Sequence, residues 1–286
     1  MKYMLHDPRA VYNVQVEIEG VSLADYQDIT NTFATYLKEK TQARAIADGY
    51  LHALRRCPKA NPADLWWHVI YQYYLKQYSD QSWKRAAGFA LEWAFVGFYQ
   101  PLLEPFGVHI SVLTAGKAVR VLEEMGIVQK VGKSKLDIIL EGECPGGSKR
   151  VFGGIHVKSS LAERIQDDVP ASLAMMEKGY WSGFVTLDAK AFPPPHGDGV
   201  VRGELGLRSD PAGALKRNYF ERDGQFDNCY SYNLRTIPSG SETSSGKRIY
   251  TLSFSDTKPD QFMRDVLERW ELVKQGFCTG TITSTS

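Results

Sequence analysis

The amino-acid sequence predicts an α/β protein with a mostly helical region over residues 1–80 and a second region, residues 81–286, in which strands alternate with helices. Two observations predict this division. Apolar residues recur every three to four positions through most of the first region, which is the spacing of one helix face. Farther along, short apolar runs are bounded by glycine, proline and charged residues, as strands are. A chain of 286 residues has room for two domains, or for one large domain with an extension, at about 150 residues per domain.

The helical region follows a strand-like start at residues 10–19. Ser22 is a suitable N-cap for a helix that runs to about residue 39, and a second helix covers about residues 42–56. Asn61 and Pro62 form a helix start signal, with asparagine as the cap and proline at the first helical position. The helix that they open, residues 63–78, carries the aromatic side chains Trp66, Trp67, Tyr71, Tyr73 and Tyr74. These fit an interface stripe or a packed helical core, and the core is the commoner arrangement.

The second region begins with a long apolar helix and then alternates. The pattern predicts further helices over about residues 82–103, 116–125, 161–166, 170–177 and 259–275. It predicts strands over about residues 109–114, 135–140, 151–160, 183–187, 230–236 and 248–254. A loop-rich stretch covers residues 192–227, and loops of this length inside a compact domain are usually functional or disordered.

Composition excludes several classes of protein. The chain is 43% hydrophobic and 23% charged, which is ordinary for a globular protein and unlike a disordered or collagenous one. Its 34 basic and 33 acidic residues exclude a uniformly basic surface, although a local basic face remains compatible with them. The four cysteines form no CxxC pair, which argues against structural zinc, and a core of this size needs no disulfides, so a reducing compartment is expected. No signal peptide or 18-residue apolar run is present in the sequence.

Three charged side chains interrupt apolar segments. Asp137 lies in the run LDIIL, and Lys158 ends the next apolar run, IHVK. If the two runs are adjacent strands, Asp137 places an oxygen ligand for a hard cation beside the ammonium group of Lys158, and phosphodiester cleavage uses this pair. The cation polarises a phosphate oxygen and acidifies a water. The lysine orients that water or balances developing charge. A structural salt bridge fits the same spacing equally well. Glu92, alone on an apolar helix one turn after Gly88, favours the metal site.

The order of these segments resembles a known family. SWKRAAGFALE (82–92), KLDIIL (135–140) and GGIHVKSSLAERIQDDVPAS (153–172) are similar to motifs of type II restriction endonucleases of the PD-(D/E)xK superfamily, in the group that reads a central CCGG. Further likeness lies at residues 61–71, 192–206, 216–226 and 230–236, so the resemblance covers most of the chain. It implies a nuclease core, a mixed β-sheet flanked by helices, and makes residues 81–286 the catalytic and DNA-recognition domain.

The resemblance also implies roles for single residues. Asp137 matches the first acidic residue of the motif, Lys158 its lysine, and Glu92 the helix carboxylate that joins the metal cluster. His156 departs from the motif, because it stands where a second acidic residue is usual and imidazole is a poor ligand for Mg²⁺. The following helix offers Asp167 or Asp168 instead, and Asp168 is slightly better placed. His156 is interpreted as a spectator in preference to a catalytic base, and both roles remain compatible with the sequence.

Candidate DNA-binding residues follow from the same resemblance. Glu163 and Arg164 match the base-reading pair of the CCGG group, where arginine donates to guanine and glutamate accepts from cytosine. Arg85, two helical turns before Glu92, matches an arginine near the DNA and fits phosphate clamping or base contact. Weaker candidates for outer bases or backbone are His196, Arg202, Lys216, Arg217 and Arg235, which as individuals are more often ordinary surface charges.

The implied function is Mg²⁺-dependent cleavage of double-stranded DNA at a palindrome with a CCGG core, of the ACCGGT type, leaving 5′-phosphate ends. A palindromic site implies a homodimer, at least on DNA, and the class implies a prokaryotic cytoplasmic enzyme. Three other functions compete with it: a non-catalytic DNA-binding protein with the same fold, a repair-type or RNA-directed nuclease, and an interaction protein built on the aromatic helices. Asp137, Lys158 and Glu92 together argue against a non-catalytic protein.

Overall fold

A six-stranded mixed sheet forms the centre of the protein in the computed structural model, which describes residues 1–5, 14–128, 131, 136–161, 165–189, 200, 203–206, 215–254 and 259–279. The strand order is β3-β4-β5-β6-β7-β8. The bounds are β3 Val108–Val112, β4 Ile138–Glu143, β5 Lys149–Lys158, β6 Trp181–Thr186, β7 Asn228–Ser231 and β8 Ile249–Thr251. The first three strands pair antiparallel and the last three continue parallel to β5, which confirms the predicted mixed sheet.

The parallel strands β5, β6 and β7 all end at one edge of the sheet. Strand β5 is joined to β6 by the crossover helix α7, Ile165–Glu177, and Lys158 pairs in register with Thr186. Because parallel strands end at the same edge of a sheet, the residues that follow β5, β6 and β7 lie together there. The site described below stands at this edge.

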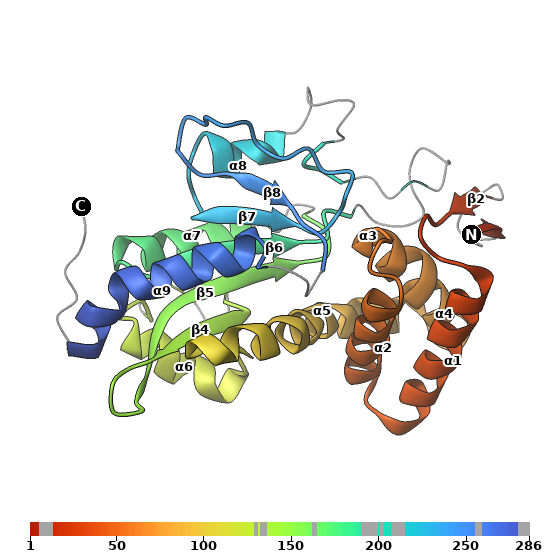
Figure 1. Ribbon diagram of the computed structural model, residues 1–286, viewed down its shortest axis with the longest axis horizontal. Helices are drawn as coiled ribbons and strands as arrows, with labels where there is room; N and C mark the ends of the chain where they lie inside the picture. The colour runs from red at the N-terminus through yellow and green to blue at the C-terminus, as the bar shows by residue number, and fades with distance from the viewer. Residues whose placement is uncertain are drawn as a thin grey trace.

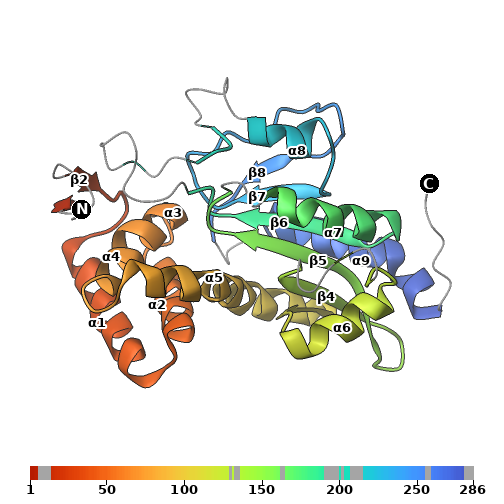
Figure 2. The same cartoon turned by 180° about the vertical axis from the view of Figure 1, so that it is seen from behind.

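Helices cover both faces of the sheet. Helix α9, Gln261–Thr279, lies in front of it in Figure 1, and α7 lies in front in the reverse view of Figure 2. The contact of α9 is close: a Cβ at Gly142 would stand 2.2 Å from the Trp270 ring, so only glycine fits under this indole. Helix α6, Ala115–Glu124, follows β3, and helix α5, Asp80–Leu103, runs from the helical region to the sheet (Figure 1).

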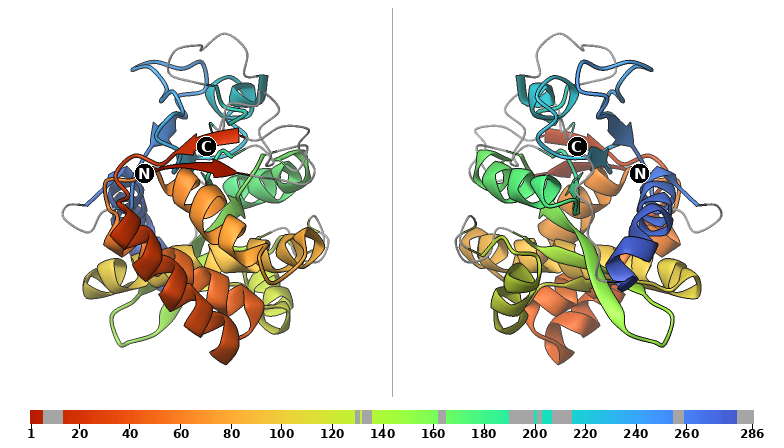
Figure 3. Two further views of the ribbon diagram at one scale, coloured as in Figure 1. Left: turned by 90° about the vertical axis from the view of Figure 1, so that its right-hand side faces the viewer. Right: turned by 90° about the vertical axis from the view of Figure 1, so that its left-hand side faces the viewer.

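The predicted helical N-terminal region is confirmed. Helices α1, Leu23–Glu39, and α2, Gln42–Arg56, lie side by side at one end of the molecule (Figure 3, left). Ser22 caps α1 as expected, in a capping box with Asp25. Before them, β1, Lys2–Leu5, and β2, Val14–Glu17, form a small antiparallel pair. The sequence pattern predicted only one strand here.

The aromatic helix differs from the prediction in its winding. In place of one helix over residues 63–78 stand α3 (Pro62–Asp64), the π-helix η1 (Leu65–Tyr71) and α4 (Gln72–Tyr74). All seven residues of η1 are buried, and the rings of Trp66, Trp67, Tyr71 and Tyr74 contact that of Trp83 on α5. The wider π winding is a local departure from the 3.6-residue period on which the prediction rested. The packed-core interpretation is confirmed.

Several boundaries also differ. The two helices expected at residues 161–166 and 170–177 are one helix, α7, with Pro170 inside it. Pro170 removes a single backbone donor, and the buried side chains of Ala171, Ala174 and Met175 hold the helix on the sheet. The linker expected at residues 141–150 is the tip of the β4–β5 hairpin, and both strands extend into it. Short helices η3, Leu215–Arg217, and α8, Asn218–Glu221, lie within the loop-rich stretch.

The remaining helical turn is η2, Glu104–Phe106, at the end of α5. None of the helices in the described part of the chain combines the length and apolarity needed to span a bilayer.

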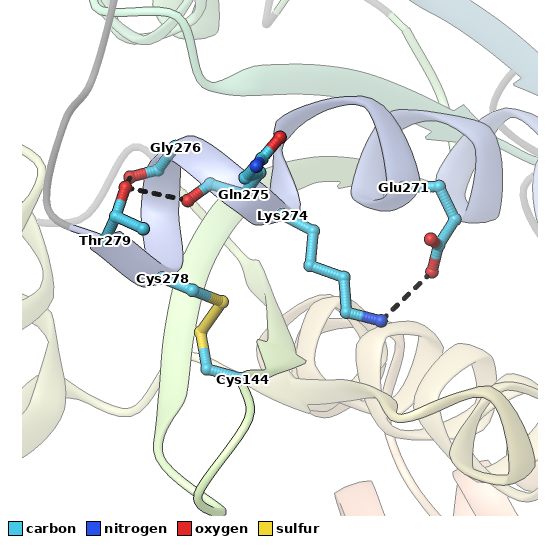
Figure 4. The surroundings of a disulfide bond; sticks show 7 residues. All are labelled: Cys144, Glu271, Lys274, Gln275, Gly276, Cys278 and Thr279. Carbon is cyan, nitrogen blue, oxygen red and sulfur yellow. Dashed lines mark hydrogen bonds and ion pairs between the residues drawn. A yellow bond between two sulfur atoms is a disulfide. The ribbon is translucent and has the colours of Figure 1, made fainter.

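A disulfide joins the hairpin tip to the last turn of α9, contrary to the expectation that a core of this size dispenses with such bonds. Cys144 and Cys278 are bonded across a Cα–Cα distance of 5.5 Å (Figure 4). The other two cysteines, Cys57 and Cys229, are buried thiols. The sequence gave no sign that Cys144 and Cys278 are paired, because the two residues are 134 positions apart.

Reduction of this bond is expected to destabilise the protein by up to about 5 kcal/mol, since it closes a loop between residues 134 positions apart. In thermal unfolding, dithiothreitol lowers the Tm of the wild-type protein to that of Cys278→Ser, whose own Tm does not respond. Cys57→Ser, which leaves the bond intact, keeps the response. If dithiothreitol leaves the Tm of the wild-type protein unchanged, the expectation is wrong.

Candidate active site

Asp137 stands at the start of β4, against the end of β5. Its backbone N–H donates to Ile155 O at 3.3 Å, which places the side chain beside the last residues of β5. The carboxylate oxygen Oδ2 accepts from Val157 N at 2.7 Å and from Lys158 Nζ at 2.9 Å. The two residues singled out in separate apolar runs are therefore in direct contact, through adjacent antiparallel strands.

Lys158 bridges two carboxylates. Its Nζ lies 2.9 Å from Asp137 Oδ2 and 3.0 Å from Oδ2 of Asp168, in the first turn of α7. Burial lowers the pKa of this amine, but the two carboxylates more than offset that effect, so the pKa of Lys158 is raised. Lys158 is consequently an ammonium ion at neutral pH.

Glu92 approaches the same group from α5. Its side chain is buried, at 9% exposure, on a helix whose neighbouring residues are apolar. Burial, and then the charge of Asp137, raise the pKa of Glu92 to about 8, while Lys158 lowers it. A carboxyl group held in its neutral form by burial and by a second carboxylate is a group that a divalent cation would ionise.

These residues have the chemistry of a site for a hard cation. Carboxylate oxygens are the ligands that Mg²⁺ prefers. Asp137 and Asp168 contact Lys158, and buried Glu92 lies close enough to interact electrostatically with Asp137 and Lys158. Among the residues that the structure describes, no three acidic, histidine or cysteine side chains form a ready-made metal cage. Lys158 lies between two of the carboxylates instead.

The structure separates the alternatives for the missing acid. Asp168 is 3% exposed and is ion-paired with Lys158, whereas Asp167 faces solvent. His156 is fully buried on β5, with its ring 5.4 Å from that of Phe226. Burial therefore favours Asp168 over Asp167, and the ring contact of His156 supports its interpretation as a packing residue.

The structure describes four of the eight predicted DNA-binding residues, namely Arg85, Lys216, Arg217 and Arg235. Glu163, Arg164, His196 and Arg202 are outside the described residues. Arg85 is exposed on α5 and lines a pocket of about 500 Å³ with Gln42, Ala43, Ser82 and Ala86. Its position in a pocket wall at the junction of α2 and α5 suits contact with a phosphate.

Three other predicted residues make contacts within the protein. Lys216 pairs with Glu204 at 2.7 Å. Arg217 donates to Leu205 O and Ile237 O and pairs with Glu221. Arg235 forms a bidentate ion pair with Asp64 of α3, both bonds 2.7 Å long. These bonds tie the segments that carry the three cations to other parts of the chain.

Sequence reasoning missed the partners of these cations and a further buried acid, Asp188. Asp64 is 2% exposed at the end of α3, next to the aromatic residues of η1. Because a buried charge is costly without a partner, its place in the sequence already indicated that a partner exists. Asp188 follows the apolar strand β6 as Asp137 precedes β4, and it is 1% exposed. The rule that singled out Asp137 would have singled out Asp188 too.

The mixed sheet with its flanking helices is that of a PD-(D/E)xK nuclease core, and the Lys158 ion pairs with Asp137 and Asp168 lie at its edge. The family model described as BsaWI restriction endonuclease type 2 matches residues 117–258. The chain belongs to the type II restriction endonucleases, enzymes that cleave DNA at specific sites.

The chain is similar to one enzyme of that family in both sequence and structure. The chain is 44% identical over 258 residues, 86% of its own length and 92% of the relative's, to the type II restriction enzyme AgeI of Thalassovita gelatinovora. The solved structure described as a specific AgeI–DNA complex matches with a TM-score of 0.86 and 41% identity, covering 94% of this chain and 99% of that one.

Proposed function

We propose that this enzyme cleaves double-stranded DNA, in a Mg²⁺-dependent reaction, at a palindrome with a CCGG core of the ACCGGT type. The observation that carries the proposal is the contact of Lys158 with Asp137 and Asp168 beside buried Glu92. The likeness to AgeI supports the recognition sequence, and its complex with DNA supports duplex DNA as the substrate.

Glu92, Asp137 and Asp168 would hold the cation. When bound, Mg²⁺ supplies polarisation of a phosphate oxygen and acidification of the attacking water. Water attacks phosphorus in line, and the bond from phosphorus to O3′ breaks, which leaves a 5′-phosphate and a 3′-hydroxyl. The ammonium group of Lys158 orients the water and balances negative charge on the phosphate; because its pKa is raised, it acts as a cation and not as a proton acceptor.

The proposal includes an assembly and a cellular setting. A palindrome is read by two subunits related by a two-fold axis, so the enzyme acts as a homodimer, at least on DNA. Residues 81–286 form the catalytic and recognition domain, and residues 1–80 support it. The bond network from Asn61 and Asp64 to Asn233, Leu234 and Arg235 is consistent with this support. A restriction enzyme works in the prokaryotic cytoplasm.

Arg85, Glu163, Arg164, His196, Arg202, Lys216, Arg217 and Arg235 are the proposed DNA contacts. Arg85 has the structural setting of a phosphate contact, because it is exposed and lines a pocket. Lys216, Arg217 and Arg235 are paired with acidic residues in the structure, so each must exchange or share a partner to touch DNA.

Mapping of cut ends tests the function. A long DNA of known sequence is digested with Mg²⁺, and all ends are sequenced. Cuts confined to sites with a CCGG core, with 5′-phosphates, are expected. Cuts without a fixed palindrome would indicate a repair-type nuclease, and binding without cuts would indicate a non-catalytic relative. RNA in place of DNA serves as a control substrate, and it remains intact.

Asp168→Asn is expected to reduce cleavage by at least about 100-fold, because the substitution removes a proposed cation ligand and a charge next to Lys158. His156→Ala costs far less, since this ring packs against Phe226. His156→Leu preserves more of the side-chain volume and controls for the cavity. The measurement is single-turnover cleavage of a CCGG duplex. The reverse ranking assigns the role to His156, and equal small effects point to Asp167 or Glu177.

Metal-free enzyme is expected to lose stability as the pH rises from about 5 to 8, relative to Glu92→Gln. Burial raises the pKa of Glu92 from 4.5 to about 8, so the folded state holds a proton in this range that the unfolded state has lost. The free energy of unfolding then falls by at most about 1.4 kcal/mol per pH unit. Urea unfolding in EDTA at several pH values measures the difference. Parallel stability curves for the two proteins contradict the assignment.

A further inference from the structure

Asp188, a buried acid outside the candidate active site, lies just after the end of β6. It is 1% exposed, and its φ of +40° makes it the one non-glycine residue with positive φ among the described residues. Aspartate tolerates this left-handed conformation better than most residues, but the conformation persists only where surrounding contacts enforce it.

Each polar group of Asp188 has a partner. Its N–H donates to Thr186 Oγ1 at 2.8 Å, and its carbonyl accepts from Asn233 Nδ2 at 3.0 Å. The carboxylate oxygen Oδ1 accepts from the N–H groups of Glu204 and Leu205, at 2.7 and 3.1 Å. Oδ2 accepts from Thr236 Oγ1 at 2.7 Å. Three donors on one carboxylate offset part of the cost of its burial, which still raises the pKa of Asp188 to about 6.

These bonds join two loops that come from distant parts of the sequence. The segment 203–206 is held through the backbone of Glu204 and Leu205, and the segment 233–236 is held through Asn233 and Thr236. Gly203 fits only without a side chain, because a Cβ there would stand 2.1 Å from the Asp188 carboxylate. The backbone of the first loop therefore lies directly against this carboxylate.

The held segment in turn positions two proposed DNA contacts. Glu204 Oε1 accepts from Lys216 Nζ at 2.7 Å, and Leu205 O accepts from Arg217 Nη1 at 2.9 Å. The Leu205 side chain is fully buried in a small core that also contains Leu161 and Ile165. These two residues flank the segment with Glu163 and Arg164.

We propose that Asp188 is a positioning residue for DNA recognition: its carboxylate fixes segment 203–206 and thereby sets Lys216, Arg217 and the Leu205 core contact in place. The inference rests on the proposed function, since it concerns how residues proposed to contact DNA are held. Asp188, at 1% exposure, acts through this segment and not by direct contact with DNA.

Asp188→Ala, Asp188→Asn and Gly203→Ala separate this role from a general loss of stability. The asparagine keeps an Oδ1 acceptor for Glu204 and Leu205, and its Nδ2 can donate to Thr236 Oγ1, so it rescues the contacts. Gly203→Ala displaces the carboxylate without changing it. Trp270→Phe is the matched control, since it weakens the core under α9, away from this network.

Two measurements are made on each full-length variant. Hydrogen exchange reports the protection of the segment that contains the Glu204 and Leu205 amides, and competition binding in Ca²⁺ compares a CCGG duplex with a scrambled duplex. For Asp188→Ala and Gly203→Ala we expect exchange at least about tenfold faster and a specificity ratio at least about tenfold lower. Asp188→Asn stays near wild type in both, and Trp270→Phe lowers only the Tm.

Unchanged exchange in Asp188→Ala overturns the proposal, as does an asparagine variant that behaves like the alanine variant. Faster exchange with an unchanged specificity ratio overturns the recognition role and leaves only a structural one. If the wild-type enzyme shows no preference for the CCGG duplex, the proposed function fails. The exchange of Glu204 and Leu205 then decides separately whether Asp188 holds the segment.

Discussion

Asp137→Ala is expected to reduce cleavage by at least about 1000-fold while specific DNA binding is largely retained. The substitution removes a proposed cation ligand and the carboxylate that accepts from Lys158 Nζ at 2.9 Å, so the loss falls on the chemical step. Single-turnover cleavage in Mg²⁺ and competition binding in Ca²⁺ measure the two properties separately.

A matched variant controls for folding. The Asp137 carboxylate also accepts from Val157 N at 2.7 Å, and alanine leaves this buried donor unpaired. Asp137→Asn keeps an acceptor there and removes only the charge, so it is expected to be as inactive as the alanine variant but closer to wild type in Tm. Lys158→Ala is expected to lose activity to a similar degree. Wild-type cleavage rates in any of these variants refute the assignment of the site.

Arg164→Ala is expected to weaken binding to a CCGG duplex by several orders of magnitude. A bidentate contact from arginine to guanine is worth about 1–3 kcal/mol against the wrong base, and a symmetric dimer makes it twice. Weak, salt-dependent binding to a scrambled duplex is largely spared, because it comes from phosphate contacts. Competition binding with the two duplexes at two salt concentrations measures the change.

Arg85→Ala provides the contrast. Arg85 lies in a pocket wall on α5, and if it clamps a phosphate, its loss weakens binding to both duplexes together and reduces the salt dependence. Glu163→Ala is expected to lower the specificity ratio as Arg164→Ala does. If Arg164→Ala leaves the ratio of CCGG to scrambled binding unchanged, the assignment is wrong, and the loops around His196–Arg217 become the place to search.

The elements that the sequence predicted well are those fixed by local chemistry. Helix α2 has the bounds expected from its apolar spacing, and α1 begins after the Ser22 cap. Caps and periodicity act over a few residues, so they can be read without knowing the fold. The π-helix at Leu65–Tyr71 escaped prediction because it breaks that periodicity inside a fully buried segment.

Part of the candidate site was visible for the same reason. Charges at Glu92 and Asp137 interrupt apolar segments, and burying a charge is costly unless a partner or ligand offsets it. A local sequence therefore shows that a partner exists, but it does not show which one. The two neighbouring apolar runs suggested Lys158 as the partner of Asp137, the resemblance to a family gave both residues a role, and the strand register brings them together.

The sequence by itself determined the α/β class, the helical N-terminal region and which charges stand in apolar surroundings. Only the tertiary structure decided that Asp168 pairs with Lys158, that Arg235 pairs with Asp64, and that Cys144 bonds to Cys278. Each of these choices joins residues on different elements, up to 171 positions apart. Such partners are chosen by how the sheet and helices pack, because packing brings distant side chains within bonding distance and no local pattern records it.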